Sequence, residues 1–154
     1  MKRFVWRLQR VLDVKAKQEQ IKRAELFEIT EKLAETRRIL LRRQRILRRI
    51  IAEIAENEPQ QRLGQQEFFL KYSATTDEQI RKLKNSISEL ELRQRKKMTE
   101  LIHVRRFKES LENLRAEVKR RFIEEQEKLE QKVLDEAATM SFVRKNEHAR
   151  RKRG

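Results

Sequence analysis

A heptad pattern of apolar residues constrains this chain more than any other feature. Apolar side chains recur in the first half at alternating steps of three and four residues, a spacing typical of the contact face of a coiled-coil helix. The positions are Leu26, Ile29, Leu33, Thr36, Leu40, Arg43, Leu47, Ile50 and Ile54, and only Thr36 and Arg43 among them are not apolar. The second half repeats the pattern through Ile80, Leu83, Ile87, Leu90, Leu101, Val104, Leu111, Val118, Phe122 and Leu129. Its polar interruptions are Gln94, Lys97, Lys108, Arg115 and Glu125. The sequence therefore predicts two long helices and an all-α fold.

Residues that break helices are concentrated between the two patterns. The run Asn-Glu-Pro at 57–59 ends the first pattern, and Gly64 follows it. Thr75 and Glu78 then form a capping-box pattern, which marks the start of a helix. We therefore expect one coiled-coil domain over 1–154, with helix 1 over about 1–57, a connection over about 58–74, helix 2 over about 75–146 and a basic tail over 147–154.

A single connection makes the two helices antiparallel, since neither apolar stripe can be buried alone. Matching the two stripes predicts four contacts: Ile54 near Ile80, Leu47 near Ile87, Leu33 near Leu101, and Leu12 near Phe122. Residues beyond about Val133 then have no partner from helix 1. The predicted fold is a long antiparallel two-helix coiled coil, or helical hairpin, with an overhanging C-terminal helix.

The charge and composition narrow the class of protein. The 154 residues include 40 Lys and Arg against 25 Asp and Glu, a formal net charge of +15, which attracts polyanions. The chain has no cysteine, which excludes disulfides and thiolate metal sites. No stretch is apolar enough to span a bilayer, and Arg7 and Arg10 interrupt any signal-peptide core. We expect a cytoplasmic protein.

Motifs of catalysis are nearly absent from the sequence. A phosphate-binding glycine loop is missing, and the two glycines are isolated. Glu100 and His103 match the E-x-x-H element of helical di-iron sites, but such a site needs a second copy and further carboxylates. His148 has no glutamate three residues before it. We predict that the chain is not an enzyme and binds no cofactor or metal.

The stretch RRILLRRQRILRR, residues 37–49, places four arginines on one helix face: Arg38, Arg42, Arg45 and Arg49. Two interpretations stay open. The strip binds phosphate or carboxylate groups of a partner, or it is a solvated flank partly paired with Glu89, Glu91 or Glu100. Sequence-specific nucleic-acid binding is disfavoured, because no zinc-finger, basic-zipper or RNA-recognition motif is present.

Aromatic residues gather in two regions of the expected hairpin. Phe68, Phe69 and Tyr72 lie in the expected connection, where they either cap the core or meet a partner. Two adjacent phenylalanines point in different directions, so at least one should face solvent or a partner.

The opening stretch is the second such region. Val5, Leu8 and Leu12 continue the apolar stripe, Phe4 and Val11 widen it, and Trp6 lies elsewhere. A free amphipathic helix on a membrane surface is the rival interpretation. The continuing stripe favours helix pairing, with apolar surface left over for something else.

The two ends of the chain resemble a known family. FVWRLQRVLDVKAKQE at 4–19 and LDEAATMSFVRKNEHA at 134–149 resemble the FliJ family, small cytosolic components of the bacterial flagellar type III export apparatus. YscO-type proteins of virulence secretion are the sister possibility. The resemblance implies a non-enzymatic coiled coil similar to the central stalk of rotary ATPases, associated with the inner membrane peripherally through the export apparatus.

The resemblance also implies partners. The paired ends would sit in the pore of the hexameric export ATPase FliI and promote its assembly and activity. The expected ATPase-binding residues are Phe4, Leu8, Val11, Leu12, Leu134, Asp135 and Phe142. The part near the connection would bind the export gate protein FlhA, by position through Arg42, Arg45, Phe68, Phe69 and Tyr72, and the chain would also bind export chaperones. The alternative is a basic coiled-coil module for nucleic acid or an anionic membrane surface.

Overall fold

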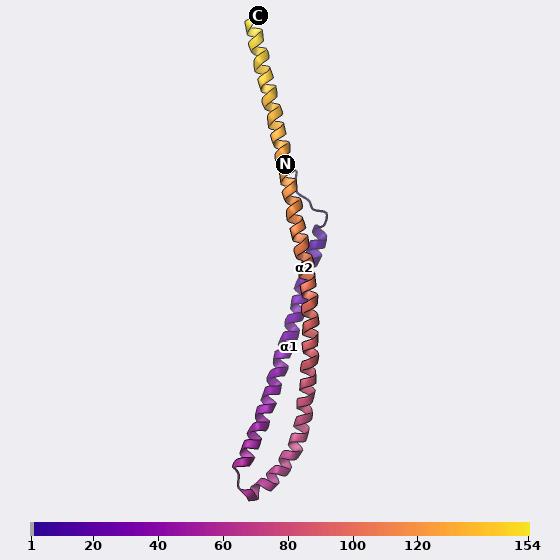
Figure 1. The fold of residues 1–154 in the computed structure, drawn as a ribbon, viewed down its shortest axis with the longest axis vertical. Helices are drawn as coiled ribbons and strands as arrows, with labels where there is room; N and C mark the ends of the chain where they lie inside the picture. The colour runs from indigo at the N-terminus through magenta and orange to yellow at the C-terminus, as the bar shows by residue number, and fades with distance from the viewer. Residues whose placement is uncertain (1) are drawn as a thin grey trace. The chain divides into compact units, whose positions relative to one another are not determined.

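Two helices make up nearly all of the chain. The computed structural model describes residues 2–154, apart from the side chain of Gln61. Helix α1 spans Gln9–Glu56 and helix α2 spans Pro59–Arg153, and no strand occurs in these described residues (Figure 1). The contacts divide the chain into two compact units: a terminal unit, Met1–Lys15 with Arg106–Gly154, and a hairpin unit, Ala16–Arg105. In each unit α2 packs against the N-terminal half of the chain, so the predicted all-α helical hairpin is confirmed.

The turn of the hairpin unit is tight and held by side chains. Pro59 is the first residue of α2, a position where its missing N–H costs nothing. Arg62 donates hydrogen bonds from Nε to the carbonyl of Asn57 (2.5 Å) and from Nη2 to that of Ala55 (2.9 Å). Asn57 Nδ2 donates to Gln65 Oε1 at 2.7 Å. These bonds satisfy one of the last carbonyls of α1 and that of Asn57 just after it, and they hold the reversal of the chain within two residues.

The prediction of a connection over 58–74 is therefore wrong. This segment is the first part of α2, since apart from Gly64 it consists mainly of residues that form helices well. Thr75, the expected cap, lies inside the helix with its hydroxyl 3.4 Å from the carbonyl of Lys71. Thr76 is buried. The single coiled-coil domain over 1–154 stays a prediction.

The predicted register between the helices is also wrong. In the hairpin unit, Lys22 Nζ lies 2.9 Å from Glu100 Oε2, which places Leu101 beside this part of α1 rather than beside Leu33. In the terminal unit, Leu12 clusters with Leu111 rather than with Phe122. The reason is the tight turn. Because α2 begins at Pro59 and not near residue 75, each residue of α1 faces a residue of α2 that lies earlier in the sequence than predicted.

The N-terminal segment is extended rather than helical. We predicted a helix from the start, but α1 begins at Gln9, and residues 2–6 have no regular structure. In an extended chain alternate side chains share one side. Trp6 is buried and Phe4 half-buried, while Val5 between them is 82% exposed. The expectation that Val5 lies in the contact face and Trp6 outside it is thus reversed.

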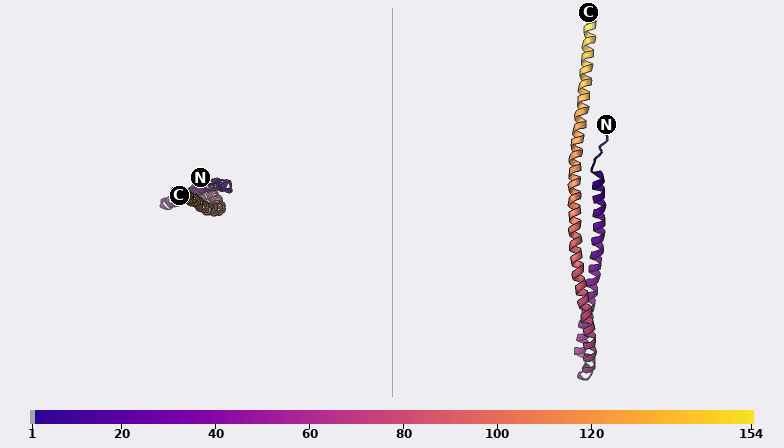
Figure 2. Two further views of the ribbon diagram at one scale, coloured as in Figure 1. Left: turned by 90° about the horizontal axis from the view of Figure 1, so that it is seen from above. Right: turned by 90° about the vertical axis from the view of Figure 1, so that its right-hand side faces the viewer.

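The far end of α2 overhangs. All residues from 127 to 154 are exposed. Lys2 lies near Glu127 and Glu130, and beyond them the views in Figures 1 and 2 show no other described segment beside the helix. The overhang starts somewhat before the predicted Val133. The helix also runs through the predicted basic tail over 147–154 as far as Arg153, because four basic residues in its last turn suit the negative end of the helix dipole.

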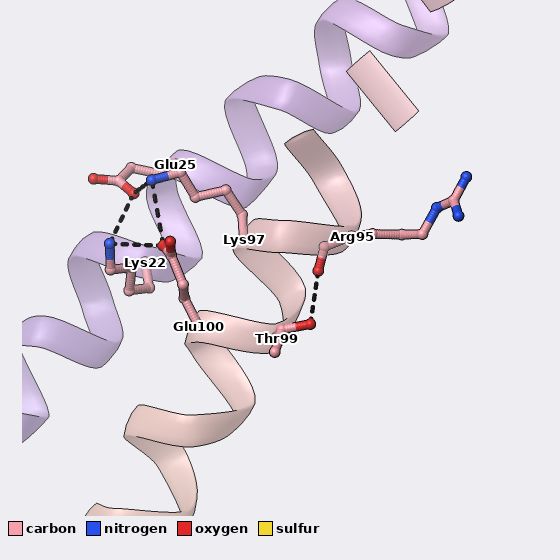
Figure 3. Close-up of polar contacts among 6 residues, drawn as sticks. All are labelled: Lys22, Glu25, Arg95, Lys97, Thr99 and Glu100. Carbon is pink, nitrogen blue, oxygen red and sulfur yellow. Dashed lines mark hydrogen bonds and ion pairs between the residues drawn. The ribbon is translucent and has the colours of Figure 1, made fainter. Parts of the chain in front are cut away.

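A cluster of alternating charges joins the helices of the hairpin unit (Figure 3). Glu25 Oε2 lies 2.8 Å from Lys97 Nζ, and Glu100 Oε2 lies 2.9 Å from Lys22 Nζ. The hydrogen bond from Lys97 lowers the pKa of Glu25, and the one from Lys22 lowers that of Glu100. The bond to Glu25 raises the pKa of Lys97. These four residues replace an apolar layer with polar contacts that fix the register locally.

Candidate partner-binding surfaces

A small aromatic cluster holds the terminal unit together. Trp6, Leu12 and Leu111 form its buried core, against which Phe4, Leu8 and Val118 pack. The ring centroids of Phe4 and Phe122 are 5.5 Å apart at an interplanar angle of 52°. Arg115 lies over the ring of Phe4 and donates from Nε to Gln9 Oε1 at 2.9 Å. The extended N-terminal segment is therefore clamped onto α2.

This cluster uses some of the expected ATPase-binding residues for the protein's own packing. Leu12 is buried and Leu8 half-buried, so neither offers much surface to a partner. Phe4, expected outside the contact face, packs on Phe122 instead. Val11, in contrast, is exposed on the first turn of α1, as expected for a residue that contacts a partner.

The remaining expected ATPase-binding residues lie on the overhang. Leu134 is 68% exposed and Phe142 65% exposed, and Asp135 is exposed beside them. Their position on α2 follows from helix spacing: Leu134 and Phe142 are eight residues apart, so they lie within about 80° of each other around the helix. Exposed apolar side chains that gather on one part of a helix make it a candidate surface for binding another protein.

The arginine strip forms a second, basic surface on the hairpin unit. Its four residues, Arg38, Arg42, Arg45 and Arg49, are all exposed, with Leu41 exposed between them. Two of the three glutamates expected to pair with them have other partners, since Glu91 lies 2.9 Å from Arg37 and Glu100 pairs with lysines. Among the described residues, no ion pair involves the strip, which favours the interpretation that it binds acidic groups of a partner.

The aromatic residues after the turn divide into exposed and covered side chains. Phe68 is 67% exposed and stacks on Tyr72 with ring centroids 6.3 Å apart. Phe69 and Tyr72 are half-buried. As predicted for two adjacent phenylalanines, one faces solvent. The surface available to a partner here is thus mainly Phe68.

The structure does not bring the two residues of the E-x-x-H element together with further metal ligands in the part of the chain that it describes. Glu100 is engaged by Lys22 and Lys97, and His103 lies exposed. Within residues 2–154 there is no cluster of three or more His, Cys, Asp or Glu residues suited to a metal ion. Over the same residues, neither helix contains a stretch long and apolar enough to cross a membrane.

Sequence reasoning missed the role of Trp6. The helical spacing assumed from the first residue placed it away from the stripe, whereas the alternation of Phe4, Val5 and Trp6 in an extended chain buries it. Two large aromatic residues separated by one residue were the available signal. Arg115, which breaks the apolar stripe of α2, was the other signal, since its guanidinium covers Phe4.

One comparison with known proteins gives a match. The family model described as flagellar FliJ protein matches residues 3–147, nearly the whole chain. No curated protein and no solved structure matches the chain.

Proposed function

The chain belongs to the flagellar FliJ protein family and is a component of the flagellar export apparatus, and we propose that it acts there as a non-enzymatic stalk. Its terminal unit binds the pore of the export ATPase FliI and promotes assembly and activity of the hexamer. Its hairpin unit contacts the export gate protein FlhA and export chaperones. These contacts hold it in the cytoplasm at the inner membrane.

The observation that carries the ATPase contact is the exposure of Leu134 and Phe142 on the overhang. A helix that leaves such side chains in water gains stability when a partner covers them. Val11 and Val5 add exposed apolar surface on the N-terminal half of the same unit. Phe4, Leu8 and Leu12 act indirectly, because they position the segment that carries Val5 and Val11.

The test replaces the exposed pair and measures binding to the cognate ATPase. Leu134→Ala with Phe142→Ala should weaken binding by about 1–3 kcal/mol, the usual range for burying such side chains at an interface. Stimulation of ATP hydrolysis should fall in parallel, while helicity and melting stay unchanged. The matched control is Leu63→Ala with Phe27→Ala, which removes equally exposed side chains from the hairpin unit. Equal losses in both variants would refute the assignment to the overhang.

The proposed gate-binding surface combines Arg42 and Arg45 with Phe68. The two arginines are exposed without an ion pair among the described residues, and Phe68 presents an apolar face in the same unit. Arg42→Glu with Arg45→Glu should abolish most binding to the cytoplasmic region of FlhA. Arg93→Glu with Arg95→Glu makes the same change of charge on α2 and should leave that binding intact.

The same pair of variants separates this proposal from the alternative of a polyanion-binding module. Binding to nucleic acid or anionic vesicles depends on total charge and falls steeply with salt. If both charge variants lose binding to FlhA equally, and the loss follows salt concentration, the surface is a general polyanion site and not a gate-binding surface.

A further inference from the structure

The overhang of α2 carries an apolar stripe that continues the contact face of the terminal unit. The covered positions Leu111, Val118 and Phe122 are separated by steps of seven and four residues. The same steps lead on to Leu129, Val133 and Met140. Ala137 and Val143 lie on the same side of the helix. We call the exposed residues Leu129, Val133, Ala137, Met140 and Val143 the tail stripe.

The spacing keeps the tail stripe on one side of a straight helix. Steps of seven and four give a repeat of 11 residues over three turns, close to the period of an unstrained helix. Covered contact positions before residue 127 and the exposed tail stripe after it therefore form one continuous face. The N-terminal segment covers the first part of this face, and nothing among the described residues covers the second.

The charges on both sides of the tail stripe are separated along the helix. Acidic side chains dominate its beginning: Glu124, Glu125, Glu127, Glu130, Asp135 and Glu136. Basic side chains dominate its end: Arg144, Lys145, Arg150, Arg151, Lys152 and Arg153. A second copy of this helix in antiparallel orientation would place acid opposite base at both ends. A parallel copy would place like charges together, which is unfavourable.

We propose that the tail stripe binds the tail stripe of a second copy of this chain, forming an antiparallel pair. The two-fold axis lies near Ala138, where Val133 of each copy meets Val143 of the other. The overlap then covers about residues 127–149, roughly 35 Å of helix. The basic tip at 150–153 reaches the acidic side chains of the other copy where its N-terminal segment begins to cover α2.

This pairing goes beyond the proposed stalk function and uses a different helix face. Met140 and Phe142 are two residues apart, so they project about 200° from each other around the helix. The side that carries Leu134 and Phe142 is thus distinct from the tail stripe. Self-association is measured without the ATPase, so failure of one proposal does not imply failure of the other.

The first experiment is a charge swap in the full-length chain, with mass measured by sedimentation equilibrium at about 10–100 µM, where weak complexes are detected. Glu124→Lys, Glu125→Lys and Glu127→Lys form one variant, and Arg150→Glu, Arg151→Glu and Arg153→Glu form the other. Each variant alone should dimerise at least about tenfold more weakly than the wild type, because like charges then meet at both ends. An equal mixture should restore the dimer.

The second experiment tests the orientation. The chain has no cysteine, so a single introduced thiol reports only on its own position. With the axis near Ala138, two copies of Ala137→Cys lie within about 10 Å, and two copies of Glu147→Cys lie about 27 Å apart along the helix. A thiol cross-linker of about 10 Å should therefore join chains through position 137 only.

A third variant tests the stripe itself. Val133→Lys with Met140→Lys should abolish the dimer without loss of helicity, and Leu134→Lys on another face should leave it intact. Three results would overturn the proposal: a wild type that stays monomeric over this range, a charge-swap mixture that does not restore the dimer, or cross-linking through position 147 as efficient as through position 137.

Discussion

Truncation of Leu111 tests whether the aromatic cluster clamps the N-terminal segment onto α2. Leu111 is buried in contact with the cluster that includes Trp6 and Leu12. Removing a buried leucine side chain costs about 2–5 kcal/mol, depending on how far the site can collapse. This cluster has only three buried residues and can relax, so we expect about 2–3 kcal/mol for Leu111→Ala, or roughly 30- to 150-fold in the docking equilibrium.

The chain supplies its own probe for this measurement. Trp6 is the only tryptophan, so its fluorescence reports on docking of the extended segment alone. Far-UV circular dichroism reports on the helices, and residues 2–6 contribute little to it because they are not helical. In Leu111→Ala, the urea midpoint followed by Trp6 emission should fall well below the midpoint followed by ellipticity.

Leu129→Ala is the matched control, since it removes the same atoms from an exposed position on the same helix. It should leave the free energy of unfolding followed by Trp6 emission within about 0.5 kcal/mol of the wild type, as surface substitutions usually do. If Leu111→Ala also stays within this range, or if both signals shift together, the clamp is not a local packing unit and the reasoning fails.

Two further predictions concern the hairpin unit. The pKa of Glu100 is lowered from 4.5, so the stability it contributes is present above pH 4.5 and is lost as pH falls through the lower folded value. The gap in thermal midpoint between wild type and Glu100→Gln should therefore close on acidification; a gap that persists at the lowest pH would contradict the charge cluster. Gly64 is helical with no atom within 4 Å of an added Cβ, so Gly64→Ala should stabilise the protein by about 0.5–1 kcal/mol and Gly64→Pro should cost about 3 kcal/mol in thermal melts. A neutral result for both would mean that the segment after Pro59 is a loop.

The sequence predicts the helices well because apolar periodicity is a local and repeated signal. It identifies both helices, the antiparallel hairpin and the overhang, since each depends on many residues that agree with one another. The chemistry of the turn depends on few. The hydrogen bond from Arg62 to the carbonyl of Asn57 helps to close the turn within two residues, whereas the predicted connection over 58–74 had seventeen. No pattern in the sequence predicts that bond.

An error in the predicted position of the turn shifts the predicted register along both helices. Heptad stripes match in several registers that differ by whole turns, and only the position of the turn selects one. Placing the connection too late moved every predicted contact, including that of Leu12 with Phe122. The N-terminal segment failed for another reason: helix spacing was extended through Trp6, where burial of two aromatic side chains favours an extended chain.

The distance along the chain between the members of each contact has a consequence for the order of folding. Arg43 and Gln79 are 36 residues apart, whereas Gln9 and Arg115 are 106 residues apart. Closing a longer loop costs more chain entropy and takes longer, so we expect contacts to form first beside the turn and last around Trp6. During synthesis the segment with Phe4 and Trp6 leaves the ribosome before the part of α2 around Leu111 on which it packs. The segment around Trp6 should also open first. A protein that binds this segment in its open form would therefore break few native contacts.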